Sequence, residues 1–400
     1  MSTLKVDAIR HNSATSDAIT THSDGTASAK IIDVGGGPLS NRNLCINGAD
    51  MMVAQRGTST TGLQNTGGVY TIDRFAHRRG GTWANAEWKD EQVNSGTGLF
   101  KKALKKTTTT AEGSAASSGK YVMIGYYLEV QDSVAAFGDG TAEAKSFTVS
   151  FYVKASIATT YCLHLATSHL ITQKAYMKPF TVNNPNVWER KTCTIDALTN
   201  SIGTLSAGAS DNGSGLRFHW VLDAPTGGNP ANTWYTHTNP PTSFTYPPGQ
   251  SPSGYANTLN ATFELGGVQI EAGTVATQLE HRRFGDELRS CQRYYEKSYP
   301  QGIAPGAASY YSGSFTRRDG TASSVPRYYD VNYKVVKRTT PNITLYNPTT
   351  GGSASCRLDS GSYSAAPSSQ ADARMMVYSN TGSPPSHYGI FFHYTLDAEM

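Results

Sequence analysis

Apolar and polar residues alternate along several stretches of this chain, which is the pattern of a half-buried β-strand. The clearest stretches are residues 120–131, 145–156, 216–222 and 263–268. In one of them Phe147, Val149 and Phe151 alternate with serine and threonine. Many strands with one buried face each, and no helical pattern between them, predict an all-β protein built from two packed antiparallel sheets.

Residues 266–295 combine three elements in a short distance. Val268 and Ile270 alternate with polar residues and predict a strand. A glycine turn follows, and then a short helical run in which Leu288 and Cys291 lie three positions apart on one face. We interpret this segment as the last strand of the sandwich and the crossover into a further domain.

A glycine- and proline-rich break and the distribution of strand-like stretches predict three parts of the chain. Residues 1–38 contain too few apolar residues for a core and end in three glycines and a proline, so they form an extended arm whose apolar residues Leu4, Val6 and Ile9 attach it to other chains. Residues 39–290 form the antiparallel β-sandwich. Residues 291–400 form a small second β domain, since alternation returns there.

Composition reduces the number of functional classes that fit the chain. Charged residues make up only 16% of the 400 residues and the net charge is +4, which gives no indication of nucleic-acid binding. No apolar run approaches the roughly 20 residues that span a membrane, so no membrane insertion is expected. The five cysteines are scattered, odd in number and without a CxxC pair. They therefore indicate buried free thiols in a protein made in the cytoplasm.

Catalytic patterns are absent from the sequence. No GxSxG motif occurs, and no serine or cysteine has a recognisable catalytic setting. Five carboxylates cluster, and we interpret them as a solvated edge rather than a glycosidase pair: Glu264, Glu271, Glu280, Asp286 and Glu287. Histidine spacing predicts no metal site, no cofactor is implied, and the basic run 100–106 (FKKALKK) is expected in a solvated surface loop.

Aromatic residues are the best candidates for ligand binding, because flat rings stack on the apolar faces of sugars. Trp234 and Tyr235 lie in a long stretch rich in glycine, proline and asparagine, the composition of a functional loop. The candidate ligand-binding residues are Trp83, Trp88, Trp234, Tyr235, Tyr310 and Tyr311. For each of them a structural role is the competing interpretation.

Several segments resemble a known family. Three segments resemble tail fibres and virion appendage proteins of tailed, cyanophage-like phages. They are QIEAGTVAT followed by GDELRSCQRYY, NRNLCINGADMMVAQRGTST near the start, and FHYTLDAEM at the end. Residues 2–27 are similar to the segment that attaches such proteins to the particle. The resemblance implies a central jelly roll like a carbohydrate-binding module, a homotrimer, and a location on the virion.

Together these observations predict a non-enzymatic virion fibre subunit. Its arm would bind other virion proteins, and its sandwich would recognise a host-surface glycan. Two alternatives remain: a capsid decoration, collar or baseplate protein that binds no receptor, and a depolymerase that degrades surface polysaccharide.

Overall fold

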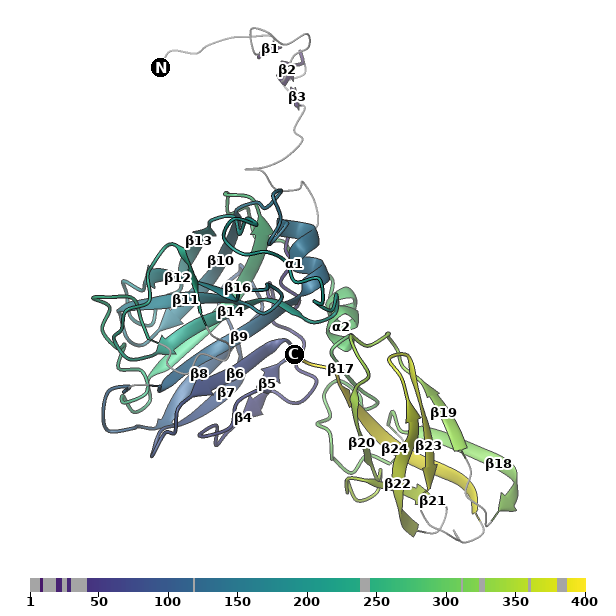
Figure 1. Ribbon diagram of the computed structural model, residues 1–400. Helices are drawn as coiled ribbons and strands as arrows, with labels where there is room; N and C mark the ends of the chain where they lie inside the picture. The colour runs from purple at the N-terminus through teal and green to yellow at the C-terminus, as the bar shows by residue number, and fades with distance from the viewer. Residues whose placement is uncertain are drawn as a thin grey trace.

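The computed structural model describes residues 8–9, 19–23, 27–29, 42–117, 119–237, 245–310, 312–323, 328–358, 361–379 and 387–400. The predicted arm residues Leu4 and Val6, and the predicted ligand residue Tyr311, lie outside the described residues. Ile9 belongs to β1 (Ala8–Ile9), which pairs with β2 (Ile19–Thr21), and β2 pairs in turn with β3 (Ala27–Ala29). This small antiparallel sheet is set apart from the sandwich (Figure 1).

The central part of the chain is a sandwich of two antiparallel sheets, as the alternation predicts. One sheet contains β4 (Ser59–Thr60), β7 (Glu87–Asn94), β8 (Lys102–Thr110), β10 (Phe147–Ala155), β13 (Glu189–Ile195) and β16 (Thr262–Ala272). The other contains β5 (Val69–Ile72), β6 (Phe75–Gly80), β9 (Tyr121–Glu129), β11 (Thr160–Thr167), β12 (Lys174–Thr181), β14 (Ser214–Asp223) and β15 (Trp234–Thr236). We call them the six-stranded and the seven-stranded sheet.

The strand order is that of a jelly roll. From β8 onward the chain passes repeatedly from one sheet to the other. As a result β8, β16, β10 and β13 lie side by side in one sheet, and β9, β14, β11 and β12 in the other. This nesting of early strands beside late ones is produced by two Greek keys folded over each other. The predicted all-β sandwich is therefore confirmed, and its topology is a jelly roll.

Inward-facing apolar side chains form the core between the sheets. Phe147, Val149, Phe151 and Val153 from β10 are fully buried there, together with Trp220 from β14. Each removes a large apolar surface from water, worth about 25 cal/mol per Å². The apolar faces predicted for β10, β14 and β16 thus lie in this core.

A glycine pair in β16 is required by close packing. A side chain at Gly266 would place its Cβ 2.4 Å from the Phe100 ring, and Gly267 adopts a positive φ of 55°. The register between β10 and β16 shifts at this point, between Ser150 and Tyr152. Only glycine fits such a bulge without strain.

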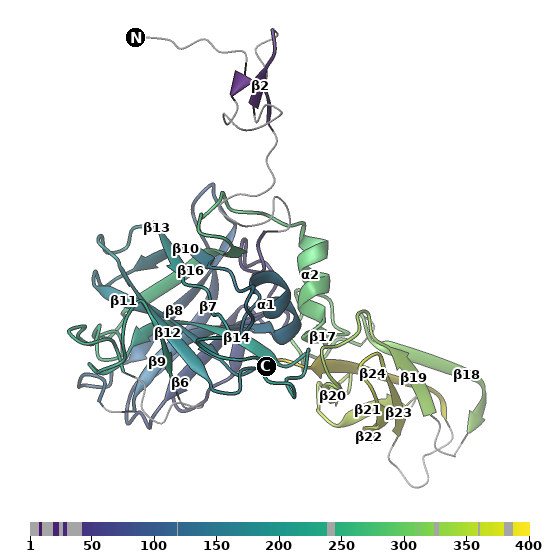
Figure 2. The ribbon, with the colours of Figure 1, turned by 45° about the horizontal axis from the view of Figure 1, so that its top comes forward.

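Two helices flank the sandwich (Figure 2). The helix α1 (Val130–Phe137) interrupts the strand pattern and was not expected from the sequence; it ends at Gly138 in the left-handed conformation. The helix α2 (Phe284–Gln292) is the predicted crossover, with Cys291 fully buried and Leu288 half-buried.

The C-terminal part forms a further antiparallel sheet, as the returning alternation predicts. Its strands are β17 (Tyr295–Lys297), β18 (Phe315–Ser323), β19 (Tyr328–Asn332), β20 (Asn342–Tyr346), β21 (Ser355–Leu358), β22 (Gly361–Gln370), β23 (Arg374–Ser379) and β24 (His387–Asp397). The long β24 is central, because β17, β18, β20 and β21 all pair with it. Val377, Ile390 and Phe392 lie in the separate core of this sheet.

One feature of the structure corrects the sequence analysis, and another agrees with it. Residues 102–106 of the basic stretch lie in strand β8 rather than in a solvated loop, and Lys106 is fully buried. The five cysteines, all within the described residues, are buried free thiols. That second observation agrees with the sequence analysis.

Candidate functional site

The outward side of the seven-stranded sheet carries a cluster of arginine, tyrosine and histidine. These residues alternate with the core residues of their strands, so they point away from the sandwich interior. The cluster, which we call the outer face, consists of Arg78 in β6, Tyr127 in β9, Arg217 and His219 in β14, and His164 in β11. Register pairs place Tyr127 opposite Arg217, and His219 opposite His164.

Tyr127 is the centre of the outer face, and like His219 it is largely buried, with 8% of its surface exposed. The guanidinium carbon of Arg78 lies 4.9 Å from the centre of the Tyr127 ring, and that of Arg217 lies 5.7 Å from it. The His219 ring meets the Tyr127 ring edge-on at 5.6 Å, and its Nε2 is 3.4 Å from the tyrosine hydroxyl. One aromatic ring is thus held by two cations and an imidazole, the kind of cation–π arrangement that fixes a ring in place.

A glycine leaves room beside this ring. Gly125 pairs with His219 in the neighbouring strand. A Cβ at position 125 would lie 3.1 Å from the Cγ of Arg78 and 3.4 Å from the hydroxyl of Tyr127. Any larger residue would push these side chains apart, so the glycine allows them to converge.

The histidines of the outer face are neutral. The rings of His164 and His219 stack with centres 5.3 Å apart, and their Nδ1 atoms are 3.2 Å apart. Burial, followed by the neighbouring His237, lowers the pKa of His164 to about 3. Burial is also the main cause that lowers the pKa of His219 well below its usual value. Neutral imidazoles can both donate and accept hydrogen bonds.

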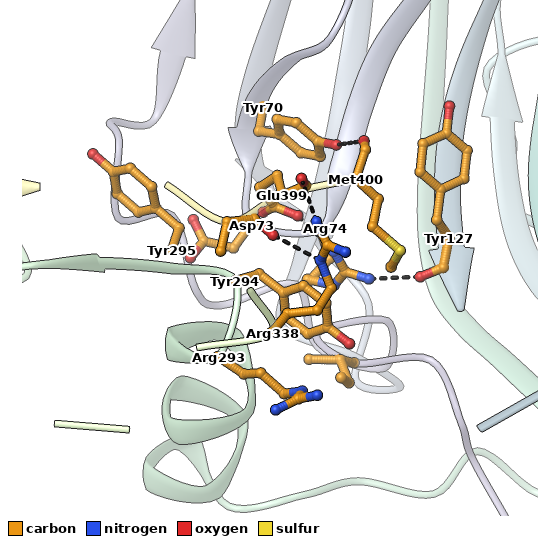
Figure 3. A network of polar contacts seen from close by, with 12 residues as sticks. Tyr70, Asp73, Arg74, Tyr127, Arg293, Tyr294, Tyr295, Arg338, Glu399 and Met400 are labelled. Atoms are coloured by element: carbon orange, nitrogen blue, oxygen red, sulfur yellow. Dashed lines mark hydrogen bonds and ion pairs between the residues drawn. The ribbon is translucent and has the colours of Figure 1, made fainter. Parts of the chain in front are cut away.

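The backbone of the outer face is anchored by Arg74, at the junction between the sandwich and the C-terminal sheet (Figure 3). Its guanidinium stacks 3.4 Å from the centre of the Tyr294 ring. One of its nitrogens donates to the carbonyl oxygen of Tyr127 and another contacts the carboxylate of Glu399, both at 2.5 Å. The strand that carries Tyr127 is thereby tied to the end of the chain.

The last residues of the chain also position Arg78. The carbonyl oxygen of Met400 accepts hydrogen bonds from the Tyr70 hydroxyl and from Arg78 Nη2, each at 2.8 Å. Arg338 holds the same segment from the other side, donating to the carbonyl oxygens of Ala398 and Glu399 at 2.9 and 3.1 Å. The segment 398–400 therefore lies between the sandwich and the C-terminal sheet, and it borders the outer face.

The far part of the same sheet surface is covered. Met123, Cys162, Met177 and Val221 point outward from four neighbouring strands and pack beneath Tyr246, and all of them are buried. Tyr235 packs at the edge of this apolar cluster. The polar outer face is thus bounded by an apolar cluster on one side and by the chain's last residues on the other.

Two of the predicted ligand residues need correction. Trp83 is 1% exposed and Trp88 is fully buried, and their rings pack edge-on at 5.2 Å within the core. Trp88 is an inward position of β7, and Trp83 is packed against it from the preceding turn. Neither ring is available to a ligand at the surface, because both contribute to the sandwich interior.

The structure separates the remaining candidates. Trp234 and Tyr235 are consecutive in β15 and face opposite sides: Trp234 packs edge-on against Tyr176 and donates from Nε1 to the carbonyl oxygen of Asp196 at 2.8 Å. Tyr310 lies in the C-terminal part, where its ring stacks on Phe391. The candidates thus form no single site.

The carboxylate cluster is also corrected. Glu271 is fully buried and accepts hydrogen bonds from Arg42 Nε and from the Thr277 backbone, both at 2.9 Å. Glu287 is 7% exposed and accepts from the Asn47 backbone at 2.6 Å. These two carboxylates hold the start of the sandwich to β16 and α2, so they do not belong to a solvated edge, whereas Asp286 is exposed as predicted.

The outer face was missed because its residues are unremarkable in the sequence. Tyr127, Arg217 and His219 occupy the outward positions of strands that were recognised only for their apolar partners. The signal that could have revealed them is parity: once the inward residues are assigned, every other position faces out. Which outward residues converge depends on strand order, which alternation does not contain.

Within the described residues no three histidine, cysteine or acidic side chains come together in a way that could hold a metal ion. In the same part of the chain no helix is long and apolar enough to cross a membrane.

Comparisons with known proteins find matches among solved structures alone. No protein-family model matches the sequence, and no curated protein matches it. A family 11 carbohydrate-binding module from Clostridium thermocellum, in complex with a β-1,3-1,4-mixed-linked tetrasaccharide, is 14% identical, with a TM-score of 0.27; the match covers 55% of this chain and 99% of the module. A xylan-binding domain from Paenibacillus barcinonensis is 10% identical, with a TM-score of 0.24, over 57% of this chain and 97% of the domain. With TM-scores this low, neither likeness supports a functional statement about this chain.

Proposed function

We propose that this protein is a non-enzymatic fibre subunit of a tailed phage that binds a host-surface glycan through the outer face of its jelly roll. The observation that carries the binding part is the convergence of Arg78, Arg217 and His219 on the ring of Tyr127. In this proposal the largely buried ring holds the guanidinium and imidazole groups in place, and these groups bind and orient the hydroxyl groups of the sugar.

The charge of the outer face favours a sugar that bears an acidic group. Two guanidinium groups flank one ring, and burial lowers the pKa of Arg217, with a further contribution from Arg78. A carboxylate placed between them would relieve this repulsion and accept paired hydrogen bonds.

The placement on a virion rests on the sequence resemblance. In this proposal the arm joins other virion proteins, and three copies assemble into a homotrimer, which multiplies weak glycan contacts into avidity. Light scattering should then give about three times the 42.9 kDa chain mass. A monomer in solution would refute the trimer, and absence of the chain from purified particles would refute the virion location.

Glycan binding can be tested with matched tyrosine variants. Tyr127→Ala should weaken binding to host-surface polysaccharide about tenfold or more, or ~1.4 kcal/mol, because Arg78, Arg217 and His219 lose the ring that holds them in place. Tyr152→Ala is the control, since Tyr152 lies on the outward side of the six-stranded sheet. Titration calorimetry of both folded variants gives the comparison.

Equal affinity of wild type and Tyr127→Ala would remove the outer face from the proposal. If neither protein binds any glycan, the receptor-free structural alternative is favoured instead. Oligosaccharides released from the same polysaccharide would show that the protein is a depolymerase.

A further inference from the structure

A lysine and an aspartate are in direct contact inside the jelly roll. Lys106 of β8 and Asp90 of β7 are register partners on adjacent strands, and Lys106 Nζ donates a hydrogen bond to Asp90 Oδ1. The exposed fractions of their side chains are 0% and 2%. Both lie at inward positions, in line with Leu104 and Trp88 on the same strands. The pair therefore lies in the apolar interior and is sealed from solvent.

A third reactive group approaches the same nitrogen from the opposite sheet. His77 of β6 places its Nδ1 2.8 Å from Lys106 Nζ. The His77 ring packs against Trp88, with centres 5.6 Å apart. Amine, carboxyl group and imidazole thus meet in the core beside the Trp88 ring.

Burial shifts all three groups toward their neutral forms. It is the largest cause that lowers the pKa of Lys106, raises the pKa of Asp90, and lowers the pKa of His77. A neutral amine is a nucleophile, a neutral carboxylic acid can be attacked by it, and a neutral imidazole can accept the proton.

A second fully buried lysine–carboxylate pair among the described residues has more hydrogen bonds. In the C-terminal part Lys337 Nζ donates to Glu296 Oε2 at 2.7 Å and to the carbonyl oxygens of Gln292 and Val335. Glu296 also accepts from the backbone of Lys334 and from the Tyr394 hydroxyl. Three acceptors around the ammonium and several donors around the carboxylate stabilise an ion pair.

No comparable set of hydrogen bonds surrounds the pair in the sandwich. Within the described residues Lys106 Nζ contacts Asp90 and His77, and no carbonyl oxygen. The pair in the sandwich therefore lacks the acceptors and donors that stabilise the Lys337–Glu296 ion pair.

We propose that Lys106 and Asp90 form an intramolecular amide bond. Lys106 Nζ attacks Asp90 Cγ, and the new C–N bond produces a tetrahedral centre. His77 Nδ1 takes a proton from the nitrogen and passes it to the departing hydroxyl, so that one C–O bond breaks and one water leaves. No oxidant, reductant or cofactor takes part, because an amine and an acid give an amide and water.

Mass spectrometry of the full-length protein tests this inference. After correction for the substitution, wild type should be lighter than Lys106→Arg by the mass of one water, about 18 Da, because arginine keeps the charge but is not a nucleophile. Tryptic digestion of the unfolded wild type should give peptide 90–101 joined to peptide 106–120, because trypsin does not cleave after an amidated lysine.

The Lys337–Glu296 pair is an internal control, and its peptides should be found unlinked in the same digest. Folded wild type that shows no mass deficit and yields peptide 90–101 entirely free would overturn the proposal. This result does not depend on whether any variant folds.

Discussion

At the scale of single residues, the jelly roll is unusual for the ionisable groups that it buries. His164 and His219 lie side by side in the outer face with lowered pKa values, while Lys106 and Asp90 meet in the core. A buried group that must remain neutral makes stability depend on pH, because the unfolded chain titrates normally.

The pH dependence can be predicted for His164. Its pKa is about 3 in the folded protein and about 6.5 in an unfolded chain. The neutral folded form is therefore favoured above pH 6.5, and stability is lost as the pH falls from there toward 3. By pH 5.5 this histidine alone should cost about 1.4 kcal/mol.

Urea unfolding of wild type and His164→Gln at pH 7.5 and 5.5 isolates this effect. The free energy of unfolding of wild type should fall by about 1.4 kcal/mol more than that of the variant, since glutamine does not titrate. Equal losses in the two proteins would contradict a lowered pKa at this position.

Single residues also show how far the sequence alone can go. Alternation assigned the buried sides of β10, β14 and β16 correctly, because a half-buried strand needs an apolar residue at every second position. It failed for Lys106, since a charged residue at an inward position looks solvated until its partner on another strand is known. Trp83 and Trp88 were misassigned for a similar reason: core packing between distant segments decides their burial.

At the scale of elements, β24 and the residues after it connect the C-terminal sheet to the jelly roll. Arg56 stacks 3.5 Å from the centre of the Tyr295 ring and pairs with Asp397 at 3.0 Å. Arg74 pairs with Glu399, and both side chains are almost completely buried. Removing one partner of such a pair leaves an uncompensated charge, which typically costs 3–5 kcal/mol.

Glu399→Gln should therefore destabilise the protein by about 3 kcal/mol, because Arg74 stays buried without its carboxylate. Glu91→Gln is a matched control: Glu91 pairs with Lys89 at 2.6 Å, but both side chains are substantially exposed, and less than about 1 kcal/mol should be lost. Chemical unfolding of the two variants gives both numbers. Similar effects of the two substitutions would show that the junction contributes little.

At the scale of the whole molecule, buried polar contacts at the junction connect the jelly roll to the C-terminal sheet. The jelly roll and the C-terminal sheet have separate apolar cores. Across the boundary between them, Arg293 and Tyr294 donate hydrogen bonds to the buried Glu129 at 2.6 to 2.7 Å. Polar contacts of this kind stop stabilising the protein as soon as either the jelly roll or the C-terminal sheet unfolds. The sequence predicted two β domains but could not show this coupling, because it depends on residues far apart in the chain.

We expect calorimetry of wild type to show one unfolding transition for residues 42–400, because loss of either sheet exposes the buried charges of the junction. Arg74→Met should split this transition in two, since it removes the contacts to Glu399 and to the Tyr127 carbonyl oxygen together. Two separate transitions already in wild type would refute the coupling.

The five buried thiols have a practical consequence for following such openings. Cys162 lies beneath Tyr246, Cys193 is in the core of the sandwich, and Cys356 is in the core of the C-terminal sheet. Cys45 and Cys291 lie near the boundary between the two parts, on the segment before β4 and on α2. A thiol reagent reaches each position only when its own region opens. Pulsed alkylation followed by peptide mapping would thus give the opening rate of each region from its native cysteine, without an introduced probe residue.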